Sequence, residues 1–143
     1  MKLAQTRTLE ATNVGDTLPR TKKTFTAADL VAYGSATWDW HRLHHDTNYA
    51  VARGFAQPVI DGQMYGAMFA QAIEDWVGPR GVIEKLSVSY LSVAFAGDAL
   101  LLESSVSDTA REAGVGLITI EQTLTNGERL VSTAYSVVRI PLS

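Results

Sequence analysis

Residues 62–77 constrain the fold more than any other part of the chain, because they form a helical segment with almost no polar face. Asp61 precedes this segment as an N-cap residue, and Gly78-Pro79 ends it. Its side chains are mostly apolar or small: Met64, Tyr65, Gly66, Ala67, Met68, Phe69, Ala70, Ala72, Ile73 and Trp76. A helix that is apolar on most of its faces is buried. The rest of the chain must therefore supply a surface that surrounds this helix.

The residues after this helix alternate between apolar and polar side chains, as the strands of a half-buried sheet do. The expected strands span residues 83–93, 100–108, 117–124 and 130–140. Asn126-Gly127 predicts a hairpin with a type I′ turn between the last two. Long antiparallel strands after one buried helix indicate an α+β domain, in which a curved antiparallel sheet wraps around a central helix. The chain has no linker-like stretch, so we expect one domain over residues 1–143.

The residues before the helix are expected to form short elements. Residues 6–11 favour an edge strand, and residues 27–36 favour a helix that starts at a sequence similar to a capping box, from Thr26 to Asp29. A second short helix is expected over residues 47–53, ended by a glycine. Residues 55–60 are expected to be extended, because a proline disfavours helical backbone in the residue before it.

The charge of the chain argues against a polyanionic partner. Its formal net charge is −3, and its 12 Lys and Arg residues are scattered along the sequence. Binding of nucleic acid requires clustered cations that neutralise phosphates, so we expect no nucleic-acid partner. The chain has no cysteine, which excludes disulfides, thiolate metal ligands and a cysteine nucleophile.

The apolar stretches are too short for a membrane protein. The first seven residues lack the apolar core of a signal peptide. The stretch over residues 64–77 contains Gln71, Glu74 and Asp75 and is shorter than a bilayer span. The sequence therefore predicts a soluble cytoplasmic protein with no membrane partner.

The polar side chains with the greatest chemical potential lie within eight residues. Asp39, His41, His44, His45 and Asp46 form this cluster, which contains every histidine of the chain. A histidine exchanges a proton near neutral pH, and a nearby carboxylate orients the imidazole or polarises a water molecule. Two such groups that converge on one water molecule suit the addition of water to a double bond and the reverse reaction.

At this cluster the sequence resembles the MaoC-like dehydratases, which include the (R)-specific enoyl-CoA hydratases. Their signature is an aromatic residue and a run of small residues, followed by Gly-Asp-x-Asn-Pro-hydrophobic-His-x-Asp. Here the stretch from Tyr33 to Asp46 aligns with Asp39, Leu43, His44 and Asp46 in register. The resemblance continues through residues 52–62 and reaches Gly97-Asp98, and it covers about residues 25–140.

The resemblance implies a hot-dog fold that acts on acyl-CoA or acyl-carrier thioesters. Asp39 and His44 match the catalytic pair that activates water and transfers the proton. Gly62 matches the position whose backbone N–H binds the thioester oxygen, and helix N-termini stabilise such negative charge. We expect His41, Asp61 and Gln63 to contribute to substrate binding. No cofactor is expected, because coenzyme A is part of the substrate.

Several positions depart from the family signature. Trp38 replaces a glycine, His41 an asparagine and Arg42 a proline, while Asp61 stands where the family usually has histidine. The milder interpretation of Asp61 is an N-cap whose side chain turns onto the helix. The family also contains subunits that function only beside a different chain, including steroid side-chain hydratases. We therefore expect a homodimer or higher oligomer, with a hetero-oligomer as the alternative.

Three other functions fit parts of the same sequence. A hot-dog thioesterase needs a carboxylate that faces the thioester, and Asp61 and Gln63 lie near the right place. Zinc bound by Asp39 and the histidines 41, 44 or 45 is a second alternative, although we predict no metal. The third alternative is a subunit that binds an acyl thioester without turnover.

Overall fold

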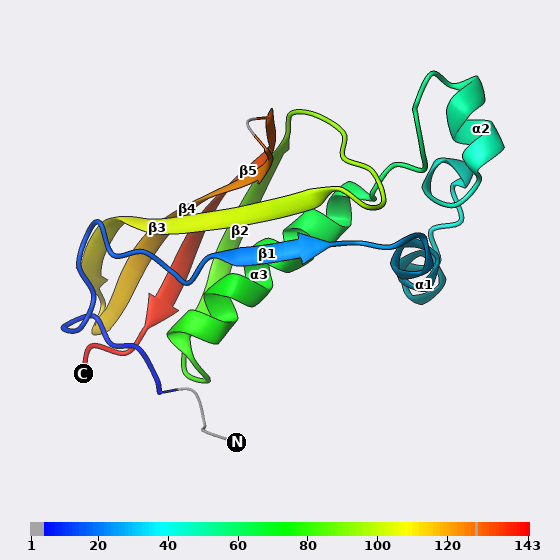
Figure 1. Cartoon of the computed structure of the whole chain (residues 1–143). Coiled ribbons are helices and arrows are strands. Elements are labelled where there is room, and N and C mark those ends of the chain that lie inside the picture. The colour runs from blue at the N-terminus through cyan, green and yellow to red at the C-terminus, as the bar shows by residue number, and fades with distance from the viewer. Residues whose placement is uncertain (1–4, 128) are drawn as a thin grey trace.

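A computed structural model describes residues 5–127 and 129–143, and in these residues a five-stranded antiparallel sheet curves around one long helix (Figure 1). The strand order across the sheet is β1-β3-β4-β5-β2. The strands are β1 (Thr21–Thr24), β2 (Val82–Tyr90), β3 (Ala99–Glu112), β4 (Val115–Asn126) and β5 (Arg129–Ile140). The helices are α1 (Ala27–Thr37), the 3₁₀ helix η1 (Arg42–His44), α2 (Thr47–Ala52) and α3 (Gly62–Val77). The expected α+β hot-dog arrangement is confirmed.

Helix α3 packs one face onto the sheet. The buried side chains of this face are Met64, Tyr65, Phe69, Ile73 and Val77. The first three belong to a core cluster with Leu100, Leu102 and Leu124 from the sheet, and the last two belong to a second cluster with Ile118, Ile120 and Val138. The sheet therefore fixes the position of α3 along its whole length.

Strand β4 shows why the sequence forms this sheet. Its even-numbered residues from Gly116 to Leu124 are buried and face α3, whereas Glu121 and Thr123 are exposed. The buried Gln122 is polar, and its side-chain amide donates hydrogen bonds to the carbonyl oxygen of Phe69 and to the hydroxyl of Ser104. A buried polar group is tolerated where it finds partners, so Gln122 joins the sheet to the helix.

The structure corrects three details of the sequence-based prediction. Residues 6–11 form no strand, and the edge strand is β1 instead. Strands β3 and β4 are longer than expected and meet at Ala113-Gly114, both with positive φ. The hairpin between β4 and β5 is present, but Asn126 is still paired with Arg129, so the turn begins one residue later, at Gly127.

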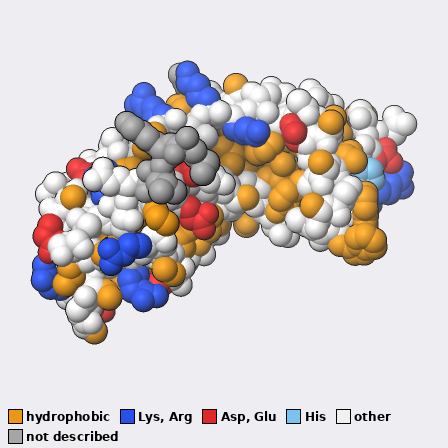
Figure 2. All heavy atoms as spheres, turned by 90° about the horizontal axis from the view of Figure 1, so that it is seen from below, with side chains coloured by type: hydrophobic (Ala, Val, Ile, Leu, Met, Phe, Trp, Pro, Cys, Tyr) orange, Lys and Arg blue, Asp and Glu red, His pale blue; other side chains and the backbone are white. Residues whose placement is uncertain are grey.

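The outer face of α3 is less buried than its composition predicts. Ala67, Gln71 and Asp75 are exposed and line an open groove of about 320 Å³ between α3, β1 and α1. The other residues that line this groove are Thr21, Lys23, Phe25, Tyr33, Met64, Met68 and Ala72. Figure 2, which views the molecule from below, shows hydrophobic side chains gathered in a hollow. The expectation of a helix buried on most faces is therefore wrong for this side, because a single sheet covers only one face.

Helices α1, η1 and α2 lie together beyond one end of the sheet, near the first turn of α3 (Figure 1). In the described part of the chain, none of the helices has both the length and the apolar character that crossing a membrane requires.

Truncation of a side chain between α3 and the sheet tests this packing. Phe69 is fully buried, so Phe69→Ala is expected to lower the free energy of unfolding by about 3–5 kcal/mol. Val51→Ala is the control, because Val51 is 56% exposed on α2 and its truncation is expected to change stability by no more than about 0.5 kcal/mol. Urea unfolding followed by circular dichroism measures both. Equal effects of the two changes would contradict the described core.

Candidate active site

Asp39 is positioned by the end of helix α1. The helix begins at Thr26, whose side chain exchanges capping hydrogen bonds with Asp29. It ends at Trp38, which adopts a left-handed backbone with φ 61°, and the N–H of Asp39 then donates to the carbonyl of Gly34 at 3.0 Å. A Cβ atom at Gly34 would lie 2.7 Å from the backbone oxygen of Asp39. Only glycine permits this close return of the chain, which places Asp39 beyond the end of the helix.

His44 is held by the backbone of Val59. Its Nδ1 lies 2.7 Å from the carbonyl oxygen of Val59. Because a carbonyl oxygen only accepts, Nδ1 carries the proton of this hydrogen bond. In the neutral imidazole, Nε2 then has a free lone pair that can accept a proton from another group.

Asp61 caps helix α3 and also approaches the histidine. Its side chain accepts a hydrogen bond from the N–H of Gln63 at 2.9 Å through Oδ1. The residue is only 8% exposed, and no partner for its other carboxylate oxygen exists among the described residues. The predicted N-cap is therefore confirmed, and the second oxygen is buried without a partner among the described residues.

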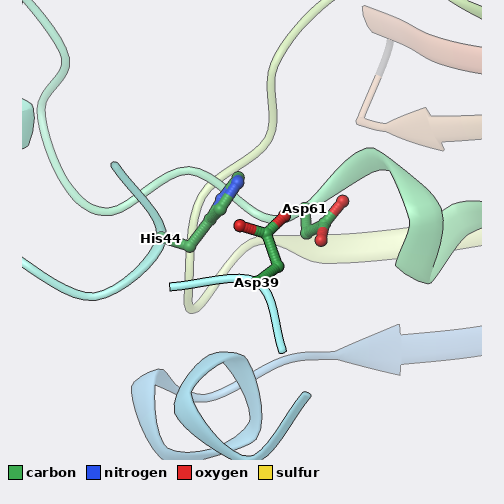
Figure 3. Close-up of side chains that lie close together, drawn as sticks. All are labelled: Asp39, His44 and Asp61. Carbon is green, nitrogen blue, oxygen red and sulfur yellow. The ribbon is translucent and has the colours of Figure 1, made fainter. Parts of the chain in front are cut away.

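Asp39, His44 and Asp61 lie close together (Figure 3). Each contributes one side-chain oxygen or nitrogen atom, and these atoms lie within 4.8 Å of one another. Asp39 and His44 are half-buried, whereas Asp61 is buried. The structure thus brings one imidazole and two carboxylates into a single cluster.

A cavity of about 640 Å³ lies between His44, Asp61 and the loop after β2, and Asp39 is not among the residues that line it. Its lining residues are His44, Val59, Ile60, Asp61, Gly62, Gln63, Tyr65, Tyr90, Leu91, Ser92 and Val93. The ring of Tyr90 packs so closely on Gly62 that a Cβ atom there would lie 2.7 Å from it. The N-terminal end of α3 is thus one wall of the cavity, where unpaired backbone N–H groups favour negative charge.

Two tyrosines near the site keep their protons. Burial raises the pKa of Tyr33, and the nearby charges of Asp61 and Asp39 raise it further. Burial raises the pKa of Tyr65 to about 12. Both phenols are therefore neutral at physiological pH and can donate hydrogen bonds.

The structure brings together some of the residues predicted from the sequence and separates others. Gly62 and Gln63 line the cavity with His44 and Asp61. His41 does not line it; its Nδ1 accepts a hydrogen bond from the N–H of Leu43 and its ring lies 5.9 Å from that of His44. His45 is exposed. Of the zinc ligands suggested by sequence, Asp39 and His44 lie within 4.8 Å of each other and of Asp61, whereas His41 and His45 lie outside this group.

Tyr90 and residues 91–93, in the loop after β2, line the cavity but were not predicted as site residues. They were expected to continue a strand to residue 93, but β2 ends at Tyr90 and the loop turns towards α3. No local sequence signal marks this contact, because it joins positions about 30 residues apart in the chain.

The sequence is similar to that of a known domain family and of several characterised proteins. The sequence profile of the MaoC like domain matches residues 10–127. An (R)-specific enoyl-CoA hydratase of Aeromonas caviae is 26% identical over 123 residues, which cover 85% of this chain and 91% of that enzyme. The 3-oxo-4,17-pregnadiene-20-carboxyl-CoA hydratase beta subunit of Mycobacterium tuberculosis is 27% identical over 117 residues, 77% of this chain and 82% of that subunit.

A solved structure has the same fold. A chain of the ChsH1–ChsH2 complex of Mycobacterium tuberculosis superposes with a TM-score of 0.81 at 26% identity, over 90% of this chain and 98% of that chain. The fold and the matched profile define a hot-dog protein of the hydratase and dehydratase type. The chain belongs to the MaoC-like dehydratase domain family.

A pair of glycine substitutions tests how Asp39 is positioned. Gly34→Ala is expected to destabilise the fold by about 1–3 kcal/mol, because the added methyl group meets the backbone of Asp39. Gly66→Ala is the matched control: it is also helical, but a Cβ atom there meets nothing within 4 Å. Alanine favours helix over glycine, so this control is expected to stabilise by about 0.5–1 kcal/mol. Thermal unfolding measures the stability of both variants. A higher melting temperature for Gly34→Ala would contradict the close contact with Asp39.

Proposed function

We propose that this protein is a hydratase or dehydratase that adds water to the double bond of an enoyl thioester, or removes it. Two observations carry the proposal: the hydrogen bond from Nδ1 of His44 to Val59 leaves the lone pair on Nε2 free, and a carboxylate oxygen of Asp39 lies within 4.8 Å of a nitrogen of this ring. The N-terminal end of α3 lies in the same cavity. A base, an orienting carboxylate and a site for negative charge are the groups that this reaction needs.

The reaction follows from these positions. Asp39 and His44 hold a water molecule, and Nε2 of His44 takes one of its protons as the oxygen attacks the β-carbon of the enoyl group. The electrons of the double bond move to the thioester oxygen, which the N–H of Gly62 stabilises. The imidazolium then returns the proton to the α-carbon, so one water molecule is added and the enzyme regains its starting state. Dehydration is the same path in reverse.

Asp61 has a double role in this proposal. Its Oδ1 caps α3, and its position within 4.8 Å of the other two groups lets it stabilise the imidazolium of His44. Its negative charge opposes the charge on the thioester oxygen, so the enolate is placed at the backbone of Gly62 rather than near the carboxylate. We propose that Gln63, on the first turn of α3, binds the substrate in the cavity. His41, which does not line the cavity, acts on substrate binding only through the ring of His44.

The groove on the outer face of α3 suits the acyl chain. Its walls include Met64, Met68 and Phe25, and Tyr33 lies both on this groove and near the charges of Asp39 and Asp61. An acyl chain whose thioester lies at Gly62 can therefore extend along α3 and bury apolar surface there.

The exposed edge strand β2 suits a partner subunit. Val82, Tyr90, Leu91 and Val93 are exposed apolar residues on or just after this strand, which is the last of the sheet. Unpaired edges with apolar side chains favour association. We propose a homodimer through this edge; a hetero-oligomer is the alternative, as one similar protein is a named beta subunit.

A thioesterase is the second candidate function, favoured by one observation. Asp61 lines the cavity, and its second carboxylate oxygen is buried without a partner among the described residues. Such an enzyme would release free coenzyme A and leave the double bond unchanged.

Substitution of the proposed pair tests the hydratase. Asp39→Asn and His44→Ala are each expected to lower kcat for hydration of a trans-2-enoyl-CoA by about 10²–10⁴-fold, because the first removes the carboxylate that holds the water molecule and the second removes the base that takes its proton. His45→Ala is the matched control, since this neighbouring histidine is exposed, and it is expected to keep full activity. Loss of the enoyl absorbance measures the rate, and a thiol reagent detects any free coenzyme A.

Unchanged hydration in Asp39→Asn and His44→Ala would contradict the catalytic pair. Release of free coenzyme A without loss of the double bond would show that the protein is a thioesterase instead.

A further inference from the structure

Two arginines and a tyrosine form a cationic surface on α2 and η1. The guanidinium carbons of Arg42 and Arg53 lie 4.6 Å and 4.9 Å from the ring centre of Tyr49. Arg42 also pairs with the carboxylate of Asp46 at 2.7 Å. Among the described residues, no carboxylate lies within 4 Å of Arg53. This Tyr49 cluster therefore has a net positive charge in a chain whose total charge is −3.

Two exposed tryptophans lie next to this cluster in the sequence. Trp38 is 80% exposed and Trp40 is 49% exposed, and their rings meet edge to face at 6.1 Å. Trp38 has a left-handed backbone, a conformation that favours glycine. The fold therefore does not require a large aromatic side chain at this position. Figure 2 shows histidine, cationic and acidic side chains directly beside a hydrophobic lobe at this end of the molecule.

Contacts between rings connect the Tyr49 cluster to the proposed catalytic histidine. The ring of His41 lies 6.1 Å from the ring of Tyr49 and 5.9 Å from the ring of His44. A substrate whose reacting end lies at His44 can therefore place a distant, charged end on the arginines.

We propose that this surface binds the nucleotide end of coenzyme A, the 3′-phosphorylated ADP group. Arg42 and Arg53 bind its phosphates, because a guanidinium group matches phosphate in charge and in hydrogen-bond geometry. The exposed tryptophans stack on its adenine ring, since aromatic side chains bind bases through their faces. The inference rests on the proposed function and assigns coenzyme A, rather than a carrier protein, as the carrier of its substrate. A carrier protein supplies acidic side chains for the arginines but no purine for the tryptophans.

Binding of adenosine 3′,5′-bisphosphate tests the proposal without turnover. Quenching of Trp38 and Trp40 fluorescence reports binding in a Trp76→Phe background, which removes the third tryptophan of the chain. Arg53→Ala and Arg42→Ala are each expected to weaken binding by about tenfold, as the loss of one charge-assisted hydrogen bond does. Arg111→Ala is the matched control, because Arg111 is equally exposed in an ion pair with Glu10 and is expected to leave binding unchanged.

Two further variants separate binding from folding. Asp46→Asn is expected to strengthen binding, because asparagine still caps α2 while the competing charge beside Arg42 is removed. Trp38→Gly suits the left-handed backbone and is expected to weaken binding without lowering the melting temperature. Weaker binding in Asp46→Asn, or unchanged binding in Trp38→Gly, would overturn the assignment.

A comparison of two substrates completes the test. Arg42→Ala combined with Arg53→Ala is expected to raise KM for an enoyl-CoA and leave KM unchanged for the N-acetylcysteamine thioester of the same acid, which lacks the nucleotide. Hydration of both substrates with no saturable binding of the bisphosphate would overturn this inference and leave the proposed function intact. Binding of the bisphosphate with no hydration would retain the nucleotide site and remove the hydratase. If the two arginine substitutions raise KM for an acyl-carrier-protein substrate but not for an enoyl-CoA, the surface binds a carrier protein rather than coenzyme A, and the inference is wrong.

Discussion

The backbone of Val59 joins the three parts that build the site. Its N–H donates to the carbonyl of Leu43, its carbonyl accepts from Nδ1 of His44, and it forms a bridge with Phe95 after β2. Two residues later Asp61 caps α3, which the sheet holds in place. One short extended segment thus fixes His44, the loop that lines the cavity and the helix start relative to one another. Movement of this segment would separate the imidazole from both carboxylates.

Local sequence patterns predicted most of the fold. The boundaries of α3, its Asp61 cap and the capping box at Thr26 depend on neighbouring residues, and all three are confirmed. Strand β1 was missed because its residues, Thr21–Thr24, are all exposed and show no alternation. The outer face of α3 was predicted as buried because composition does not show on how many sides a helix is covered.

The site was only partly predictable, because some of its contacts join segments that are distant in the sequence. Asp39 and His44 were selected from a cluster of five polar residues because they match the catalytic pair of the family that the sequence resembles, and the structure places them together. The approach of Asp61 depends on the path of the chain between η1 and α3, and the contact of Tyr90 with Gly62 depends on the curvature of the sheet. Neither of these two contacts can be predicted from the residues that surround it in the sequence. The left-handed backbone of Trp38 gives a physical reason why the family signature has glycine at this position.

The fate of the oxygen atom of water tests the central claim most directly. If a trans-2-enoyl-CoA is incubated with the protein in water labelled with heavy oxygen, mass spectrometry is expected to find one label as a hydroxyl group on the β-carbon of an intact thioester. Label in a free carboxylic acid, or no label in any product of a range of enoyl-CoA esters, would contradict an enzyme that adds water at Asp39 and His44.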